Sequence, residues 1–317
     1  MAGMKPFLGI DIGGTNIKLA TVSPTARVVE RGLVETRAGE GAARAFARIH
    51  AAARTLGPNG IAGVGIGCAG LFDERRGVLT ASPNLKAWQG TKLTALASKH
   101  FSVPILIQND ATVAAYGESV VRGPRGRNLV LITLGTGVGG GIVADGRIVR
   151  GVSGFGGEIG HMVVNSSGPR CHCGRSGCLE AYVGAYGIVR TATELRRESR
   201  KRGASPNKKL TAFAVFEAAR AGHGWARETV RIAGEQLGIA VAILLNTLNP
   251  AVVVIGGGVS ASFKALEPHI HRSVERHAFR ETIRAARIER ARLGNDAGMV
   301  GAAMLVRDTL STRHPRR

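Results

Sequence analysis

Short apolar runs that end on glycine or on small polar residues recur along this chain. Residues 7–12 (FLGIDI) form the first, and the runs at 18–24 and 27–36 follow after turn residues, which predicts a β-meander. Residues 41–56 instead place apolar side chains at helical spacing, so a helix is expected there. The chain therefore begins as an α/β protein.

The following runs alternate in the same way. Residues 61–70 (IAGVGIGCAG) and 103–110 (VPILIQND) are predicted as buried strands, and the second leads into a helix over 110–120. Residues 129–134 (LVLITL) form another strand, whose return strand closes at the Asp145-Gly146 hairpin.

The last third is mainly helical. Helices are expected through much of 182–245, a final strand and turn at 251–260, and an amphipathic helix at 297–310. Each half begins with a strand and a glycine-rich turn followed by a hairpin and helices, so two α/β domains are predicted. They are residues 1–122, completed by the C-terminal helix within 295–317, and residues 123–294, with GPRGRN (123–128) as the linker.

Composition is that of a globular protein. The 317 residues, 44% hydrophobic and 21% charged, are enough for two domains with proper cores. No apolar run reaches signal-peptide or membrane-spanning length, and cysteines are few, which favours a cytoplasmic protein that does not engage a membrane.

The net charge of +21 allows polyanionic partners. Basic residues concentrate at 196–203, at 272–292 and in the tail, without interleaved aromatic residues or a nucleic-acid-binding motif. We therefore interpret them as a solvated surface and expect no nucleic-acid partner, although their role stays open.

Three glycine-rich loops follow predicted strands: the first two are candidates for binding phosphates, and the third, at 256–258, could flank a nucleoside. Backbone N–H groups at glycines can approach a phosphate closely, a lysine can meet its charge, and an aspartate suits hydrated Mg²⁺. The alternative for the first loop is a hairpin turn that needs positive φ, but the second half repeats the same chemistry. The candidates for the nucleotide site are Asp11, Gly13, Gly14, Thr15, Lys18, Thr136, Gly137, Gly257 and Gly258.

Three of the four cysteines, Cys171, Cys173 and Cys178, fall within eight residues. This spacing, with an imidazole nearby, suits a tetrahedral zinc site, whereas a disulfide would leave one thiol unpaired and Cys68 is distant. The flanking carboxylates of Glu158 and Glu180 would be held in place by the metal.

Asp110 ends a predicted strand, where a carboxylate suits a general base that removes a hydroxyl proton, and Asn109 could orient the substrate. The alternative is that Asp110 only caps the following helix. Asn84, on a turn, with Glu158 and Glu180 completes an inventory suited to a polyhydroxylated ligand, although either glutamate could equally form a surface ion pair.

At this point the residues resemble a known family. LGIDIGGTNIK, SPNLKAW, NDATVAAYGE, LGTGVGGGIV, GGEIGHM, CHCGRSGCLEAY and VIGGGVS are similar, in order, to the ROK group of bacterial sugar kinases and repressors. The resemblance covers nearly the whole chain and is strongest to the glucokinases. It implies a two-domain actin-like ATPase (ribonuclease H-like) fold with an interdomain cleft.

The resemblance also implies an activity, the ATP-dependent and Mg²⁺-dependent transfer of a phosphoryl group to the 6-hydroxyl of a hexose, which would give glucose 6-phosphate for glycolysis. Asp110 would be the catalytic base. By similarity, the sugar would be bound by Asn84, Asn109, Asp110, Glu158, His161 and Glu180, and a structural Zn²⁺ by His161, Cys171, Cys173 and Cys178. His172 does not match a ligand position.

Other activities within this group stay open. The sugar could be N-acetylglucosamine, N-acetylmannosamine, mannose or fructose, and the basic surface could favour polyphosphate as donor. A sugar-responsive repressor is less expected, because the first phosphate loop begins at residue 9 and leaves no room for a preceding helix-turn-helix. The resemblance also suggests a homodimer or homotetramer.

Overall fold

The computed structural model describes residues 5–56, 60–199 and 210–313. They form two compact units. Unit 1 comprises the described residues within 1–128, 141–157 and 292–317, and unit 2 comprises those within 129–140 and 158–291.

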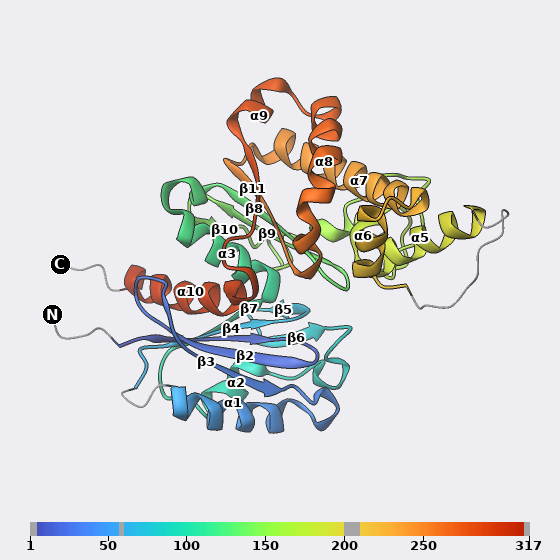
Figure 1. Cartoon of the computed structure of the whole chain (residues 1–317). Coiled ribbons are helices and arrows are strands. Elements are labelled where there is room, and N and C mark those ends of the chain that lie inside the picture. Colours follow the sequence, from blue (N-terminus) through green and yellow to red (C-terminus); the bar gives the residue numbers. More distant parts are fainter. Residues whose placement is uncertain (1–4, 57–59, 200–209, 314–317) are drawn as a thin grey trace. The chain divides into compact units, whose positions relative to one another are not determined.

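Unit 1 is built on a five-stranded mixed sheet in the order β3-β2-β1-β4-β7 (Figure 1). The first three strands are antiparallel neighbours, which confirms the predicted meander, and β4 and β7 run parallel to β1. The strands are β1 (Phe7–Ile12), β2 (Asn16–Val22), β3 (Val28–Glu35), β4 (Val64–Cys68) and β7 (Ile105–Asn109), with β5 (Leu71–Asp73) and β6 (Val78–Ala81) as a separate hairpin.

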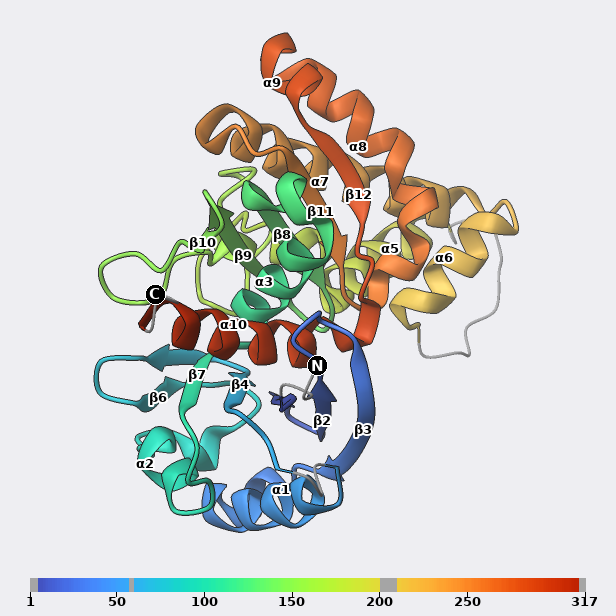
Figure 2. The ribbon, with the colours of Figure 1, turned by 90° about the vertical axis from the view of Figure 1, so that its left-hand side faces the viewer.

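Helices cover both faces of this sheet. Figure 2 shows α1 (Ala42–Leu56) on one face and α10 (Ala297–Arg313) on the other, where α10 also packs against α3 (Asp110–Arg122). The short α2 (Leu93–Ser98) contacts β7. The buried apolar residues of α1, such as Phe46 and Ile49, join those of the strands in one core.

Two glycines explain how closely α10 approaches the sheet. A Cβ on Gly9 would lie 1.9 Å from the carbonyl oxygen of Met299, and a Cβ on Gly65 would lie 1.9 Å from that of Ala302. Residues 297–306 are all buried. The expectation of an amphipathic helix is therefore wrong for this part of α10, because it is covered by the sheet on one side and by α3 on the other.

The expected linker at residues 123–128 is ordered. Gly123–Arg127 form a 3₁₀ helix against α3, where the hydroxyl of Ser119 donates a hydrogen bond of 2.7 Å to the carbonyl of Gly126. Nearby, the carboxylate of Glu118 is completely buried and forms an ion pair with Arg122. It also accepts hydrogen bonds from the backbone N–H groups of Arg292 and Leu293 and so ties the segment before α10 to α3.

Unit 2 contains the parallel strands β8 (Leu129–Leu134), β11 (Val252–Gly256) and β12 (Arg287–Arg290). The second sheet has the order β10-β9-β8-β11-β12, and β9 (Val138–Ala144) turns into β10 (Arg147–Ile148) at the predicted hairpin, where Asp145 and Gly146 both have positive φ. The helices of unit 2 are α4 (Glu180–Val183), α5 (Ala185–Ser199), α6 (Ala212–Arg220), α7 (Gly224–Leu248), α8 (Phe263–His277) and α9 (Arg280–Ala285).

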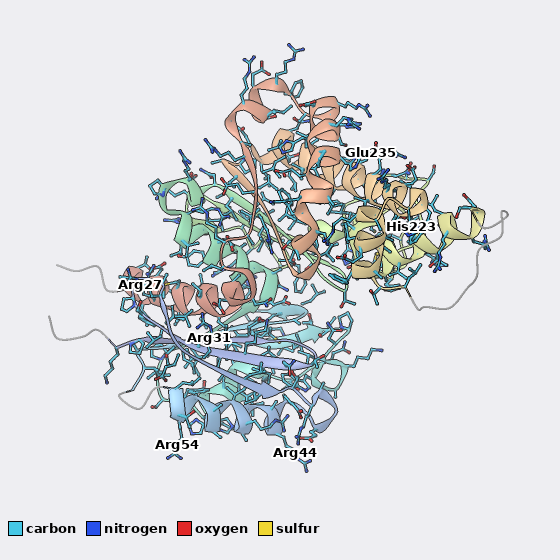
Figure 3. The ribbon with its side chains drawn as sticks, in the orientation of Figure 1. Arg27, Arg31, Arg44, Arg54, His223 and Glu235 are labelled. Carbon is cyan, nitrogen blue, oxygen red and sulfur yellow. The ribbon has the colours of Figure 1, made fainter. Side chains whose placement is uncertain are left out.

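Charged side chains are distributed over the surface of the described residues. Arg44 and Arg54 on α1 are exposed and extend into solvent, and Arg31 on β3 pairs with Asp296 at 2.7 Å (Figure 3). Within the described residues, no helix has both the length and the apolar content needed to cross a bilayer.

Candidate active site

The first glycine-rich loop joins β1 to β2. Gly13 N–H donates to the carbonyl of Asn16 at 3.1 Å, and the hydroxyl of Thr36 donates to the carbonyl of Gly13 at 2.7 Å. Neither Gly13 nor Gly14 has positive φ, so a turn that needs positive φ is the wrong explanation for this pair. Close approach is the better one, because a Cβ on Gly14 would lie 2.7 Å from the Cβ of Asn84.

Asp11 and Lys18 face each other across β1 and β2, directly beside this loop. The two are paired in the strand register, and Lys18 Nζ lies 3.9 Å from Asp11 Oδ2. Burial and, to a smaller extent, the charge of Asp110 raise the pKa of Asp11 to about 6, although the charge of Lys18 opposes both effects. A carboxylate with this environment gains from a bound cation, which fits the expectation that Asp11 holds hydrated Mg²⁺.

Asp110 is the first residue of α3, at the carboxyl end of β7. Its Oδ1 accepts hydrogen bonds from the backbone N–H of Ala111 at 2.9 Å and from Asn109 Nδ2 at 3.0 Å. Burial raises the pKa of Asp110, and these hydrogen bonds offset part of that effect. A half-buried carboxylate with a raised pKa has the properties of a general base.

The cap of α3 is Asn109 rather than Asp110. Asn109 Oδ1 accepts from the backbone N–H of Thr112 at 2.9 Å, which is N-cap geometry. Its Nδ2 donates to the carbonyl of Gly70 at 3.1 Å as well as to Asp110. The capping role that the sequence offered as the alternative for Asp110 is thus filled by its neighbour.

The residue before them, Gln108, is buried and makes a contact that the sequence did not reveal. Its Nε2 donates to Glu74 Oε1 at 2.7 Å, and its Oε1 accepts from the backbone N–H of Asn109 at 2.8 Å. Glu74 Oε2 lies 3.4 Å from Arg150 Nε. Glu74 lies in the turn between β5 and β6, and only the fold brings it to β7.

The second glycine-rich loop, in unit 2, is packed against Glu180 at the start of α4. A Cβ on Gly137 would lie 2.4 Å from Glu180 Oε2, and the same oxygen accepts from the backbone N–H of Val138 at 3.0 Å. Thr136 is exposed in this loop. The structure therefore brings the loop of Thr136 and Gly137 against Glu180, which lies more than 40 residues further along the sequence.

The third loop follows β11. Gly257 has φ of 82°, and a Cβ there would lie 2.4 Å from the carbonyl oxygen of Leu134, so only glycine fits. Gly258 has open space around the position of a Cβ. The loop therefore lies beside the end of β8.

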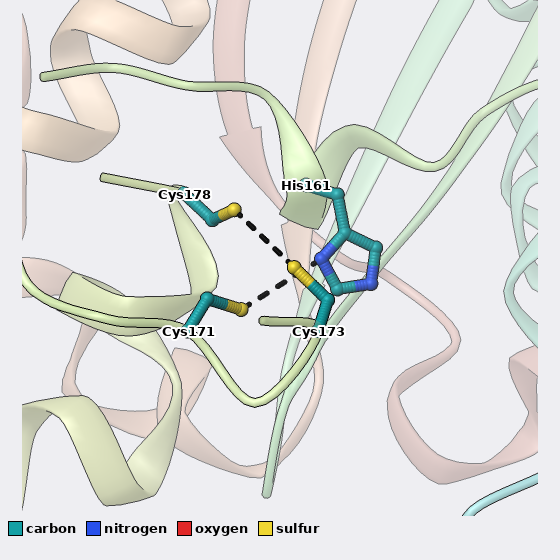
Figure 4. Close-up of side chains that lie close together, drawn as sticks. All are labelled: His161, Cys171, Cys173 and Cys178. Atoms are coloured by element: carbon teal, nitrogen blue, oxygen red, sulfur yellow. Dashed lines mark hydrogen bonds between the residues drawn. The ribbon is translucent and has the colours of Figure 1, made fainter. Parts of the chain in front are cut away.

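The four candidate zinc ligands converge (Figure 4). One ligand atom each from His161, Cys171, Cys173 and Cys178 lies within 4.8 Å of all the others. His161 Nδ1 is 3.9 Å from Cys171 Sγ, and Cys173 Sγ is 3.6 Å from Cys178 Sγ. Zinc–sulfur bonds of about 2.3 Å in a tetrahedron place two sulfurs about 3.8 Å apart, so this donor set fits zinc.

All four cysteines are free thiols, and Cys68 lies in β4 of unit 1. The disulfide alternative is therefore not formed. Isolated backbone bridges from Val163 to Cys178 and from Arg170 to Ser176 hold the cysteine segment in place.

Tyr186 on α5 contacts Glu180 and the cysteine cluster, which the cysteine motif did not predict. Its hydroxyl, which has one proton to donate, lies 3.3 Å from Glu180 Oε1 and 3.6 Å from Cys171 Sγ, and Cys171 Sγ lies 3.5 Å from the same carboxylate oxygen. His172 stacks on the Tyr186 ring at 3.9 Å between centroids, which accounts for this histidine without a ligand role. The Tyr186 hydroxyl thus lies between the cysteine cluster and Glu180.

Glu158 is exposed and immediately precedes the 3₁₀ helix Ile159–His161. Its carbonyl accepts from the backbone N–H of His161 at 3.1 Å. A cluster that fixes His161 therefore also fixes the backbone that carries Glu158.

Comparison with known proteins gives consistent matches. The sequence model of the ROK family matches residues 7–309. A glucokinase of Halalkalibacterium halodurans is 37% identical over 313 residues, which are 95% of this chain and 94% of that protein.

Two solved structures extend this likeness to the fold. A ROK hexokinase from Thermus thermophilus has a TM-score of 0.82 and 31% identity, covering 96% of this chain and 100% of that one. A ROK glucokinase from Streptomyces griseus, solved with glucose and AMPPNP, has a TM-score of 0.79 and 31% identity, covering 96% and 99%.

Proposed function

This chain belongs to the ROK family, and on that premise we propose that it is an ATP-dependent hexose kinase that phosphorylates glucose at the 6-hydroxyl. The observation that carries the proposal is the environment of Asp110. Its carboxylate is half-buried, has a raised pKa, and is oriented by Asn109 and by the first turn of α3. The likeness to a glucokinase solved with glucose and AMPPNP supports both substrates.

Asp110 acts as the general base. It accepts the proton of the 6-hydroxyl while the sugar oxygen forms a bond to the γ-phosphorus of ATP. The bond from that phosphorus to the oxygen bridging to the β-phosphate breaks, and ADP leaves. Little covalent chemistry falls to the protein in such a transfer, so positioning and charge neutralisation supply most of the rate.

The three glycine-rich loops bind the nucleotide through backbone N–H groups and Lys18. The residues proposed for this role are Asp11, Gly13, Gly14, Thr15, Lys18, Thr136, Gly137, Gly257 and Gly258. Asp11 would hold hydrated Mg²⁺, which neutralises phosphate charge when bound.

The hexose is proposed to be bound by amide, carboxylate and imidazole side chains. Asn84, Asn109, Glu158, His161 and Glu180 are proposed to contact its hydroxyl groups beside Asp110. For His161, coordination through Nδ1 would leave Nε2 to meet the sugar.

The cysteine cluster is proposed to hold a structural Zn²⁺ with His161, Cys171, Cys173 and Cys178 as ligands. Four protein donors close a tetrahedral site and leave no position for a reacting group. Its role is to hold Glu158, His161 and Glu180 in place for the sugar, as the position of the Tyr186 hydroxyl between Cys171 and Glu180 suggests.

A coupled kinase assay over glucose, mannose, fructose, N-acetylglucosamine and N-acetylmannosamine, with ATP and polyphosphate as donors, tests this function. The highest kcat/KM is expected for glucose with ATP. Preference for another sugar or for polyphosphate would move the assignment to that substrate within the family. No phosphorylation of any sugar, together with sequence-specific DNA binding in a gel-shift assay, would instead support the repressor.

The cellular setting is also a proposal. We place the enzyme in the cytoplasm at the first step of glycolysis, as a homodimer or homotetramer. Light scattering of the purified chain measures the assembly, and cell fractionation measures the compartment.

A further inference from the structure

The end of β7 carries a polar pair that the phosphoryl transfer does not use directly. Gln108 is 1% exposed, and it joins the carboxylate of Glu74 to the backbone N–H of Asn109. We propose that Glu74 and Gln108 are positioning residues for the Asp110 base, an inference that rests on the proposed function.

The chemistry of the pair permits one arrangement. An ionised carboxylate only accepts hydrogen bonds and a backbone N–H only donates one, so the Gln108 amide must turn its NH₂ toward Glu74 and its oxygen toward Asn109. The contact to Glu74 is 2.7 Å, short as expected for a hydrogen bond to a charged acceptor. Arg150, 3.4 Å from the other oxygen of Glu74, helps to orient this carboxylate.

The arrangement reaches Asp110 in two further steps. Gln108 fixes the peptide that enters Asn109, and this peptide sets the direction in which the chain leaves the strand. Asn109 then caps α3 through Thr112 and donates to Asp110 Oδ1 at 3.0 Å. All of these residues belong to unit 1.

The alternative is that Gln108 is only a buried polar group with satisfied hydrogen bonds. Such a role predicts a loss of stability on substitution and no specific effect on the chemical step. Positioning predicts a fall in kcat at nearly constant KM, since misplacement of a catalytic group by about 1 Å can cost about 100-fold in rate.

An exchange of the two side chains separates these roles. Gln108→Glu places two carboxylates face to face without a donor between them. Adding Glu74→Gln restores the pattern with the charges exchanged, because Gln at 74 can donate to Glu at 108 while the latter still accepts from Asn109. Glu217→Gln, which removes an exposed carboxylate that pairs with Arg220 on α6, is the matched control.

We expect Gln108→Glu to lower kcat for glucose about 10-fold to 100-fold with KM for glucose and ATP changed less than about threefold. The double variant should recover at least about tenfold of that loss, and Glu217→Gln should match the wild type. A wild-type kcat in Gln108→Glu would overturn the proposal. So would a loss that the double variant does not recover, because the pair would then not be its cause.

The second readout is the ionisation of Asp110, followed by ¹³C NMR of its carboxyl group and assigned with Asp110→Asn. A negative charge moved from residue 74 to residue 108 comes closer to Asp110 along this chain of contacts and should raise its pKa, so the acid limb of kcat/KM moves to higher pH. An unchanged titration would count against the proposal. If the wild type phosphorylates no sugar, the proposed function is refuted but the positioning role is not. The titration still reports whether residues 74 and 108 influence Asp110.

Discussion

Replacement of Asp11 by asparagine should stabilise the protein at neutral pH and leave its stability unchanged in acid. The Asp11 side chain is 22% exposed, and its pKa rises from 3.8 to about 6 because burial and the charge of Asp110 outweigh the opposing charge of Lys18. Its folded pKa thus lies above the unfolded one. The stability that protonated Asp11 gives to the native state is therefore fully present below about pH 4, and it is lost as the pH rises through 6.

The size of the effect follows from this pKa. A rise from 3.8 to about 6 corresponds to about 3 kcal/mol of native-state stability lost above pH 7. Asn keeps the shape of the side chain and carries no charge, so Asp11→Asn should regain up to about 3 kcal/mol at pH 7.5 and almost nothing at pH 4. Kinase activity should fall in the same variant, because the proposed Mg²⁺ contact is removed.

Urea unfolding of both proteins at pH 4, 5.5 and 7.5, in the presence of EDTA, measures this difference. Asp296→Asn serves as control, since Asp296 forms a partly exposed ion pair with Arg31 and should change stability by less than about 1 kcal/mol. In the Asp110→Asn background, Asp11→Asn should gain less, because one of the charges that raises the pKa of Asp11 is already absent. A pH-independent difference, or a loss of stability at pH 7.5, would refute the electrostatic reasoning.

Three further predictions concern catalysis, metal and folding. Asp110→Asn should lower kcat about 10²-fold to 10⁴-fold, while calorimetry should still detect glucose binding. In the wild type, the raised pKa of Asp110 should place the acid limb of the kcat/KM profile above the ordinary carboxylate range. Near-wild-type turnover of the variant would contradict the base assignment. Cys173→Ala should lower both the zinc content, measured by mass spectrometry, and the melting temperature, whereas the control Cys68→Ala should keep its zinc. Wild-type protein that contains no zinc after purification would contradict the metal assignment. Glu118→Ala should lower the free energy of unfolding, measured by chemical denaturation, by about 3–5 kcal/mol, because it removes the carboxylate that neutralises buried Arg122. A loss below about 1 kcal/mol would show that the ion pair is dispensable.

Several elements could be predicted from the sequence because their causes are local. The meander of β1, β2 and β3 follows from apolar runs separated by short turns, and the hairpin at Asp145-Gly146 from residues that tolerate positive φ. The cysteine cluster is predictable for the same reason, since three of its ligands lie within eight residues.

Features that depend on which strand or helix packs against an element could not be predicted from local sequence patterns. A helical pattern alone indicated one polar face for residues 297–310, but α10 is covered by the sheet and by α3 and is buried through residue 306. The glycines of the first loop left a turn with positive φ open as an alternative, whereas the structure shows that Gly14 leaves room for the side chain of Asn84, seventy residues further along the chain.

The sequence by itself determined the inventory of chemical groups: the phosphate loops, the carboxylate at the end of a strand, and the clustered thiols. It did so because glycine freedom, strand period and ligand spacing act over a few residues. The tertiary structure decided which of these groups touch. It placed Glu74 on Gln108 and Tyr186 on Glu180, it made Asn109 the cap of α3, and it gave Asp11 and Asp110 their raised pKa values. Hydrogen bonds and desolvation depend on neighbours brought together by folding, and no local pattern of residues specifies them.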